Sequence, residues 1–106
     1  MAEYTLGEDV YQDMEDIWEY IAQGSPGAAR HWTTEILNAF EALGKTPGIG
    51  HKREELTAFD VLFFSVGQYT IIYRLVYGHV DIVAVTQGAI DIPIFLKRRM
   101  ASWANS

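Results

Sequence analysis

The sequence predicts a single α+β domain over residues 1–106: an N-terminal strand, an antiparallel helical hairpin packed on an antiparallel β-meander, and a short C-terminal helix. The length and the apolar content of 49% are those of one domain with its own core. Apolar residues recur every three or four positions in the first half of the chain, which predicts helices. The second half instead holds three runs rich in β-branched and aromatic residues, which predict strands.

A short strand over residues 2–6 is followed by two predicted helices. The first, over residues 8–23, has one apolar face and one acidic face. Gly24 ends it, and Ser25-Pro26 is a typical helix start, because serine caps free amides and proline fits the first helical position. The second helix ends at Gly44. Such a short connection predicts an antiparallel helical hairpin.

Three strands are predicted at residues 60–66, 69–77 and 80–86. The pairs Gly67-Gln68 and Gly78-His79 separate them, and this spacing is typical of tight hairpins, so we expect an antiparallel meander. Both faces of the middle strand are apolar. One face is expected to receive the helical hairpin, and the other the C-terminal segment or a partner.

The terminal helix is predicted to begin at Asp91-Ile92-Pro93, where an aspartate can cap the first turn. Its apolar residues share one face. On the solvent side of this helix we expect Lys97, Arg98 and Arg99.

The composition excludes several classes of site. There is no cysteine, so a disulfide framework, a thiolate metal site and a cysteine nucleophile are excluded, and a reducing compartment, the cytoplasm, is expected. The first residues do not have the pattern of a signal peptide, and no apolar stretch approaches the ~20 residues of a membrane span. Neither export nor membrane insertion is expected.

The net charge of −6 is unevenly distributed. Residues 1–41 carry nine acidic side chains against Arg30 alone, whereas residues 42–106 carry seven basic and five acidic side chains. General nucleic-acid binding is not expected, because affinity for phosphate chains comes largely from Lys and Arg. A local basic patch at Lys52 and Arg53, or in the terminal helix, stays open.

No motif of a catalytic or metal centre stands out. The three histidines lack the ligand spacing of a metal site, and Ser65, His79 and Asp81 lack the elbow that frames a catalytic serine. We therefore predict no catalytic residue, metal or cofactor. Arg74 lies inside a strongly apolar strand, where a charge needs a partner. Two alternatives are open: an ion pair, for example with a carboxylate of the first helix, or direct contact with another protein.

Four segments with fixed order and spacing carry a family resemblance. They are Asp13-x-x-x-Ile17-Trp18-x-Tyr20-Ile21, Leu43-x-x-x-Pro47-Gly48-x-Gly50-x-x-Arg53-x-Glu55-Leu56, Phe64-x-Val66-Gly67-x-Tyr69-x-Ile71-x-Tyr73-Arg74 and Ile82-Val83-x-Val85-x-x-Gly88-x-x-Asp91-Ile92. Together they resemble the ParE/RelE superfamily of toxins from type II toxin–antitoxin systems, and the ParE-like branch in particular. The likeness extends over nearly the whole chain.

The resemblance implies a toxin that inhibits DNA gyrase, or a related topoisomerase, by protein contact, with a role in plasmid stabilization. RelE-like relatives instead cut mRNA in the ribosome, but the positions that match their active residues are Thr70, Ile90 and Leu96, which cannot donate to a scissile phosphate or move a proton. Such ribonuclease activity is the alternative. A further one is a non-toxic decoy that binds antitoxins, because Val85 and Gln87-Gly88-Ala89 stand where ParE-like chains are commonly basic.

The resemblance also implies a cognate antitoxin, ParD-like and DNA-binding, that forms a hetero-oligomer with the toxin. Expected contacts with the antitoxin are Trp18, Ile21, Trp32, Phe64, Tyr69 and Tyr73. Expected contacts with the target are Arg74, Asp91, Lys97, Arg98 and Arg99.

Overall fold

The computed structural model describes residues 3–88 and 90–104, with the side chains up to Ala101. The elements are β1 (Tyr4–Leu6), α1 (Val10–Ala22), α2 (Pro26–Lys45), the 3-10 turn η1 (Pro47–Ile49), β2 (Leu62–Val66), β3 (Tyr69–Val76), β4 (His79–Gln87) and α3 (Ile92–Ala104). This order confirms the predicted α+β class. None of the helices in the described part of the chain is long and apolar enough to cross a membrane.

The four strands form one mixed sheet in the order β1-β4-β3-β2. The antiparallel pairs β2–β3 and β3–β4 confirm the predicted meander. The N-terminal strand β1 lies parallel to β4, with Tyr4 opposite Val80 and Leu6 opposite Ile82. Strands β4 and β3 are therefore interior, although β1 pairs only with the first part of β4.

The helices and strands begin within two residues of their predicted positions, and one hairpin turn differs. The side chain of Ser25 accepts a hydrogen bond from the amide of Ala28 at 3.1 Å, as expected for the start of α2. The second hairpin turn, predicted at Gly78-His79, is instead Tyr77-Gly78. Both turn residues have positive φ, 53° and 79°, as a type I′ turn requires, and His79 already pairs with Val76.

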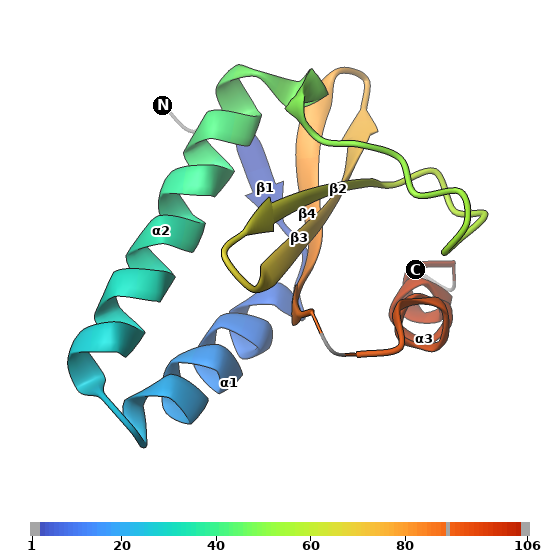
Figure 1. Cartoon of the computed structure of the whole chain (residues 1–106). Coiled ribbons are helices and arrows are strands. Elements are labelled where there is room, and N and C mark those ends of the chain that lie inside the picture. Colours follow the sequence, from blue (N-terminus) through green and yellow to red (C-terminus); the bar gives the residue numbers. More distant parts are fainter. Residues whose placement is uncertain (1–2, 89, 105–106) are drawn as a thin grey trace.

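The sheet separates two apolar clusters. In Figure 1 the helical hairpin lies on one side of the sheet and α3 on the other. One face packs against the helical hairpin of α1 and α2, with Tyr69, Ile71 and Tyr73 of β3 buried there. The other face packs against α3, where Ile72 meets Leu96. The register of β3 with β4 shifts between Ile72 and Tyr73, which is a β-bulge in the strand pairing.

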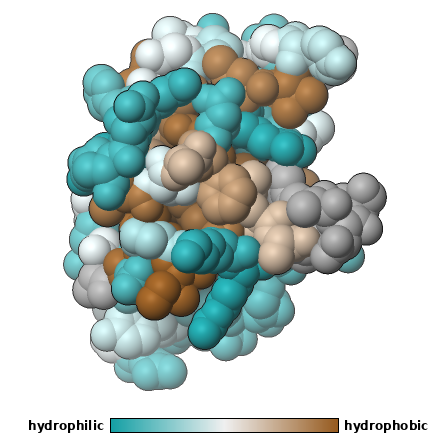
Figure 2. Space-filling view, turned by 90° about the vertical axis from the view of Figure 1, so that its right-hand side faces the viewer, coloured by the Kyte–Doolittle hydropathy of each residue, from teal (hydrophilic) through white to brown (hydrophobic). Residues whose placement is uncertain are grey.

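The α3 side of the molecule is a mixed surface. Figure 2 shows hydrophobic areas there, interrupted by hydrophilic side chains. Phe59, from the loop before β2, and Ile90 and Ile94, near the start of α3, are among the exposed large apolar residues. Apolar surface left exposed on a small domain is a common feature of protein contacts.

The hydroxyl of Tyr73 fixes the loop that leads to β2. It donates to the carbonyl of Pro47 at 2.7 Å and accepts from the amide of Gly50 at 2.9 Å. Burial raises the pKa of Tyr73 and outweighs the opposite effect of the Gly50 hydrogen bond. The tyrosine therefore stays neutral and joins the sheet to the loop.

Candidate functional site

Arg99 of α3 is held inside a polar cluster between α3, α1 and β4. Its guanidinium makes two parallel hydrogen bonds to the carboxylate of Asp13, each 2.9 Å long. It also donates to the carbonyl of Val83 at 2.9 Å. The two charged side chains are only 11% and 12% exposed. Arg99 thus joins the C-terminal helix to the first helix across the sheet.

The prediction that Arg99 faces solvent is wrong. Residues three and four positions apart share one face of a helix, and Arg99 follows Leu96 and Phe95 at these spacings. Leu96 is fully buried, and the guanidinium carbon of Arg99 lies 4.7 Å from the centre of the Phe95 ring. A long side chain can place its charge in a polar niche beside the core, and here Asp13 provides the niche.

The cluster is electrostatically matched. Asp9, at the start of α1, adds a third interaction, with a carboxylate oxygen 3.6 Å from Arg99 Nε. The hydrogen bonds with Asp13 raise the pKa of Arg99 further above its ordinary value. A buried, bidentate pair of this kind is costly to break from one side, because the remaining charge stays desolvated.

Asp13 and Arg99 also cap an open edge of β4. Strand β1 reaches only Ile82, whose carbonyl accepts from Gly7 at 2.8 Å. Beyond this point the backbone amide of Val85 donates to Asp13 at 3.1 Å, and the carbonyl of Val83 accepts from Arg99. The two side chains therefore provide hydrogen bonds that a longer β1 would otherwise provide.

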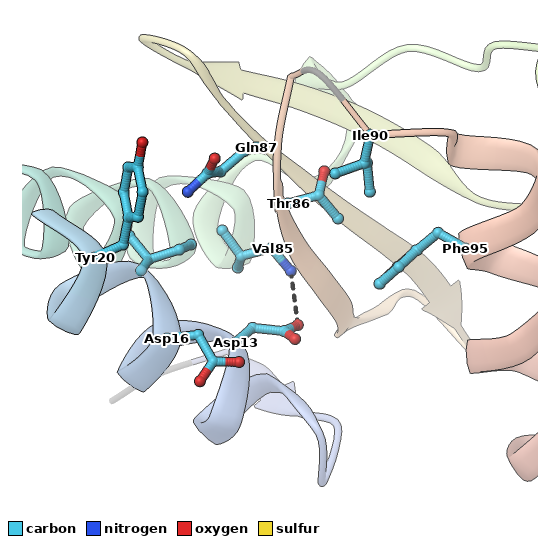
Figure 3. Close-up of a pocket in the computed structure, with 9 residues that line it drawn as sticks. Asp13, Asp16, Tyr20, Val85, Thr86, Gln87, Ile90 and Phe95 are labelled. Carbon is cyan, nitrogen blue, oxygen red and sulfur yellow. Dashed lines mark hydrogen bonds between the residues drawn. The ribbon is translucent and has the colours of Figure 1, made fainter.

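A pocket of about 390 Å³ lies beside this cap, between α1, the end of β4 and α3 (Figure 3). We call it the edge pocket. It is lined by Asp13, Asp16, Ile17, Tyr20, Val85, Thr86, Gln87, Ile90 and Phe95. The hydroxyl of Thr86 is buried without a hydrogen-bond partner in the described part of the chain, and the residue is 5% exposed. An unpaired buried hydroxyl is rare in folded proteins and marks this pocket.

The comparisons with known proteins give the family. A sequence profile described as "ParE toxin of type II toxin-antitoxin system, parDE" matches residues 4–92. The chain belongs to this ParE toxin family. The match ends where α3 begins, so Phe95 and Arg99 lie outside it.

A solved structure supports the ParE-type fold. A chain of the "Chromosomal ParDE TA system from P. aeruginosa" superimposes with a TM-score of 0.67 over 79% of this chain and 92% of that chain. The two sequences are 14% identical, so the likeness concerns the fold. A search among curated proteins found no match.

In this ParE-family chain, Arg74 forms an ion pair with its neighbour on β4. Its Nε lies 3.1 Å from a carboxylate oxygen of Asp81, directly across the strand pair. The other oxygen of Asp81 accepts from the Thr5 hydroxyl at 2.8 Å. An ion pair was one of the two predicted alternatives. The partner is a sheet residue, whereas the carboxylate of the first helix pairs with Arg99.

The other residues predicted to contact the target lie at the surface. Asp91 caps α3 by accepting from the amide of Ile94 at 3.1 Å, which confirms the predicted helix start. Lys97 and Arg98 are exposed on the same helix. Lys52 and Arg53 are exposed on the loop, where Lys52 lies 3.0 Å from Asp60 and Arg53 lies 2.7 Å from Glu55. Each loop cation thus has an acidic neighbour, which weakens the positive field of this patch.

Two of the expected antitoxin contacts are not accessible. Tyr69 and Tyr73 are buried in the cluster between the sheet and the helical hairpin, so their assignment to a docking surface is wrong. Trp18 is 44% exposed, and Ile21, Trp32 and Phe64 are partly buried around the same cluster. These four side chains remain accessible in part.

The sequence reasoning missed other exposed apolar residues. They are Tyr11 and Tyr20 on α1, Leu37 on α2, and Leu75, Val76 and Tyr77 at the tip of the β3–β4 hairpin. Tyr77 is fully exposed. Its position beside Gly78 in the predicted hairpin turn was the sequence signal that could have indicated this exposure. The edge pocket had no such signal, because residues from three separate elements form it.

Proposed function

We propose that this ParE-family chain is a toxin that acts by binding another protein, and that its target is DNA gyrase or a related topoisomerase. Membership of the ParE toxin family supports this proposal most directly. In this proposal a cognate, ParD-like antitoxin neutralises the toxin in the cytoplasm by forming a hetero-oligomer with it.

The ion pairs of Arg74 and Arg99 support adhesion over RNA cleavage. Arg74 is engaged by Asp81, and Arg99 by Asp13. Cleavage of RNA needs cationic or proton-transferring groups directed at a phosphate. The matching positions hold Thr70, which is partly buried, and Leu96, which is fully buried. The RelE-like alternative is therefore less well supported.

We assign the target contact to the exposed polar part of the terminal segment, Asp91, Lys97 and Arg98, with Arg74 at 37% side-chain exposure as a rim contact. In this proposal Arg99 is a positioning residue. It holds α3 against Asp13 and thereby sets where the exposed side chains of α3 lie.

A supercoiling and cleavage assay tests the proposal. Purified protein should inhibit DNA supercoiling by gyrase, and addition of the antitoxin should restore it. Ribosome-dependent cleavage of translated mRNA is assayed in parallel. If the protein cleaves mRNA, and substitution of Lys52, Arg53 or Arg74 abolishes this cleavage, the ribonuclease function would be established instead.

A non-toxic decoy is the second candidate function. Val85 is buried and Gln87 is uncharged, where the resembled family is commonly basic, and Ala89 lies outside the described residues. A decoy would bind an antitoxin without affecting growth. Normal growth and normal supercoiling after induced expression, together with antitoxin binding, would favour the decoy over the toxin.

A further inference from the structure

The edge pocket lies on a stretch of sheet edge that no strand covers. The amide of Gly88 donates to the carbonyl of Gln68 at 3.0 Å, so by the alternation of an antiparallel pair the backbone groups of Val85 and Gln87 point away from β3. The hydrogen bond from Val85 to Asp13 agrees with this direction. Among the described residues, no backbone group outside the ladder bonds to the outward amide of Gln87. An extended peptide can use such groups.

The side chains of the pocket add a second, independent feature. Thr86 points to the α3 side of β4, toward Ile90 and Phe95, in Figure 3. Its hydroxyl is buried, the whole residue is 5% exposed, and the hydroxyl has no partner within the described chain. Burial of an unpaired hydroxyl lowers the stability of the free protein. A ligand that hydrogen-bonds to Thr86 would offset this cost.

The walls of the pocket indicate the chemistry of the ligand. Ile17, Ile90 and Phe95 supply apolar surface for one aliphatic side chain. Asp16 lies at the exposed rim, and residues 1–29 contain no Lys or Arg that would neutralise it. A cationic side chain next to the aliphatic one matches this rim.

We infer that the edge pocket binds an extended segment of the antitoxin through its backbone. The segment hydrogen-bonds to the outward carbonyl of Val85 and the outward amide of Gln87, places an aliphatic side chain between Ile17 and Phe95, and directs a Lys or Arg to Asp16. The amide of Val85 stays bonded to Asp13. This inference rests on the proposed function for the identity of the partner. The pocket itself is defined by the chain alone.

A peptide titration tests the chemistry of the pocket directly. The probe is a short peptide of alternating valine and lysine with blocked ends, followed by NMR of the backbone amides of the full-length protein. We expect saturable shifts centred on Thr86 and Gln87. A peptide with glutamate in place of lysine, and one with N-methylated valines, should each bind at least tenfold more weakly. Equal binding of the N-methylated peptide, or shifts centred on the helical hairpin alone, would overturn the inference.

Substitution of Thr86 should change stability and binding in opposite directions. Thr86→Val removes the unpaired hydroxyl with little change of shape, so it should raise the melting temperature while it weakens peptide binding at least threefold. Asp16→Asn should weaken binding of the lysine peptide to a similar extent. Glu35→Gln, which removes an exposed charge on α2 away from the pocket, is the matched control and should change neither. A more stable Thr86→Val protein with unchanged affinity would contradict the inference.

The antitoxin complex separates this inference from the proposed function. Gln87→Pro removes the outward amide, and a circular dichroism spectrum checks that the variant is folded. Antitoxin that binds the wild type, Gln87→Pro and Asp16→Asn equally well would leave the toxin function intact and refute the pocket. If no antitoxin binds the wild type, the proposed function fails, and the peptide titration decides the role of the pocket.

Discussion

At the scale of single residues, the pair of Asp13 and Arg99 makes a strong prediction about stability. Asp13→Asn removes the buried carboxylate that makes two hydrogen bonds to Arg99 and leaves the Arg99 charge desolvated, so we expect it to lower the free energy of unfolding by about 3 kcal/mol. The exposed Asp16→Asn should change it by less than ~0.5 kcal/mol. Urea unfolding at pH 7 measures both. Equal effects of the two substitutions would show that the buried pair contributes no more than a surface charge.

Tyr73 makes a prediction about alkaline pH. Burial raises its pKa above the ordinary value of about 10, so the folded state holds the phenolic proton more tightly than the unfolded state. The resulting stability is complete below about pH 10 and is lost as the pH rises through the folded pKa. The pKa of Tyr4 is raised too, by burial first and then by Glu41, so it adds to the same loss.

The variant Tyr73→Phe isolates the contribution of this hydroxyl. It leaves the buried amide of Gly50 without its partner, so it should cost about 1–3 kcal/mol at pH 7. Its stability should then fall less steeply than that of the wild type between pH 9 and about pH 11, and Tyr4 should contribute to the remaining fall. Urea unfolding at several pH values provides the comparison. Parallel pH curves for the two proteins would exclude Tyr73 as a source of the alkaline effect.

At the scale of elements, the β3–β4 hairpin carries local strain at its tip. Tyr77 has a φ of 53°, which non-glycine residues rarely adopt, yet its side chain is fully exposed and gains nothing from packing. Tyr77→Asn gives the Asn-Gly sequence that type I′ turns prefer, so we expect a gain of about 0.5–1 kcal/mol. Thermal unfolding measures it. A loss of stability would mean that Tyr77 contributes to the native fold in a way its exposure does not reveal.

The positions of the elements could be predicted because their signals are local. Helix periodicity, the Ser25 cap and the Asp91 cap each lie within a few residues of the boundary that they define. The parallel pairing of β1 with β4 joins residues far apart in sequence, and a three-residue strand contains no information about its partner. The β-bulge between Ile72 and Tyr73 likewise depends on how β3 pairs with β4, which the sequence of either strand alone does not specify.

The candidate site was harder to predict for the same reason. Both faces of β3 are apolar, so the sequence pattern could not indicate which face the helical hairpin covers. Tyr69 and Tyr73 were therefore assigned to an exposed face, whereas they lie on the face that the hairpin buries. Arg99 has the helical spacing of the buried face of α3, but its charge favoured a solvent-exposed position. The sequence could not indicate that the carboxylate of Asp13 lies opposite it. Asp13 itself lies on the acidic face of α1 with Asp16, and although it opens one of the segments of the family resemblance, that resemblance gave it no role.

At the scale of the whole molecule, the acidic first half of the chain presents a field to any partner. Residues 1–41 carry nine acidic side chains and one basic side chain, and α1 contains no basic residue. If the antitoxin segment is basic, as the rim of the edge pocket requires, this field accelerates encounter more than it strengthens the final complex. The association rate should therefore fall about tenfold between 50 mM and 500 mM salt, because screening shortens the reach of the charges.

Substitutions distant from the pocket can separate this steering from contact. Glu15 and Glu19 are exposed on α1 and do not line the edge pocket, so the double variant Glu15→Gln/Glu19→Gln should slow association with the antitoxin severalfold and leave the dissociation rate almost unchanged. The matched control, Glu54→Gln/Glu55→Gln, removes the same charge from the loop before β2 and should slow association less. Stopped-flow association at several salt concentrations measures these rates. An equal slowing by both double variants would mean that net charge alone guides the partner, and a faster dissociation of the α1 variant would place Glu15 or Glu19 in the interface itself.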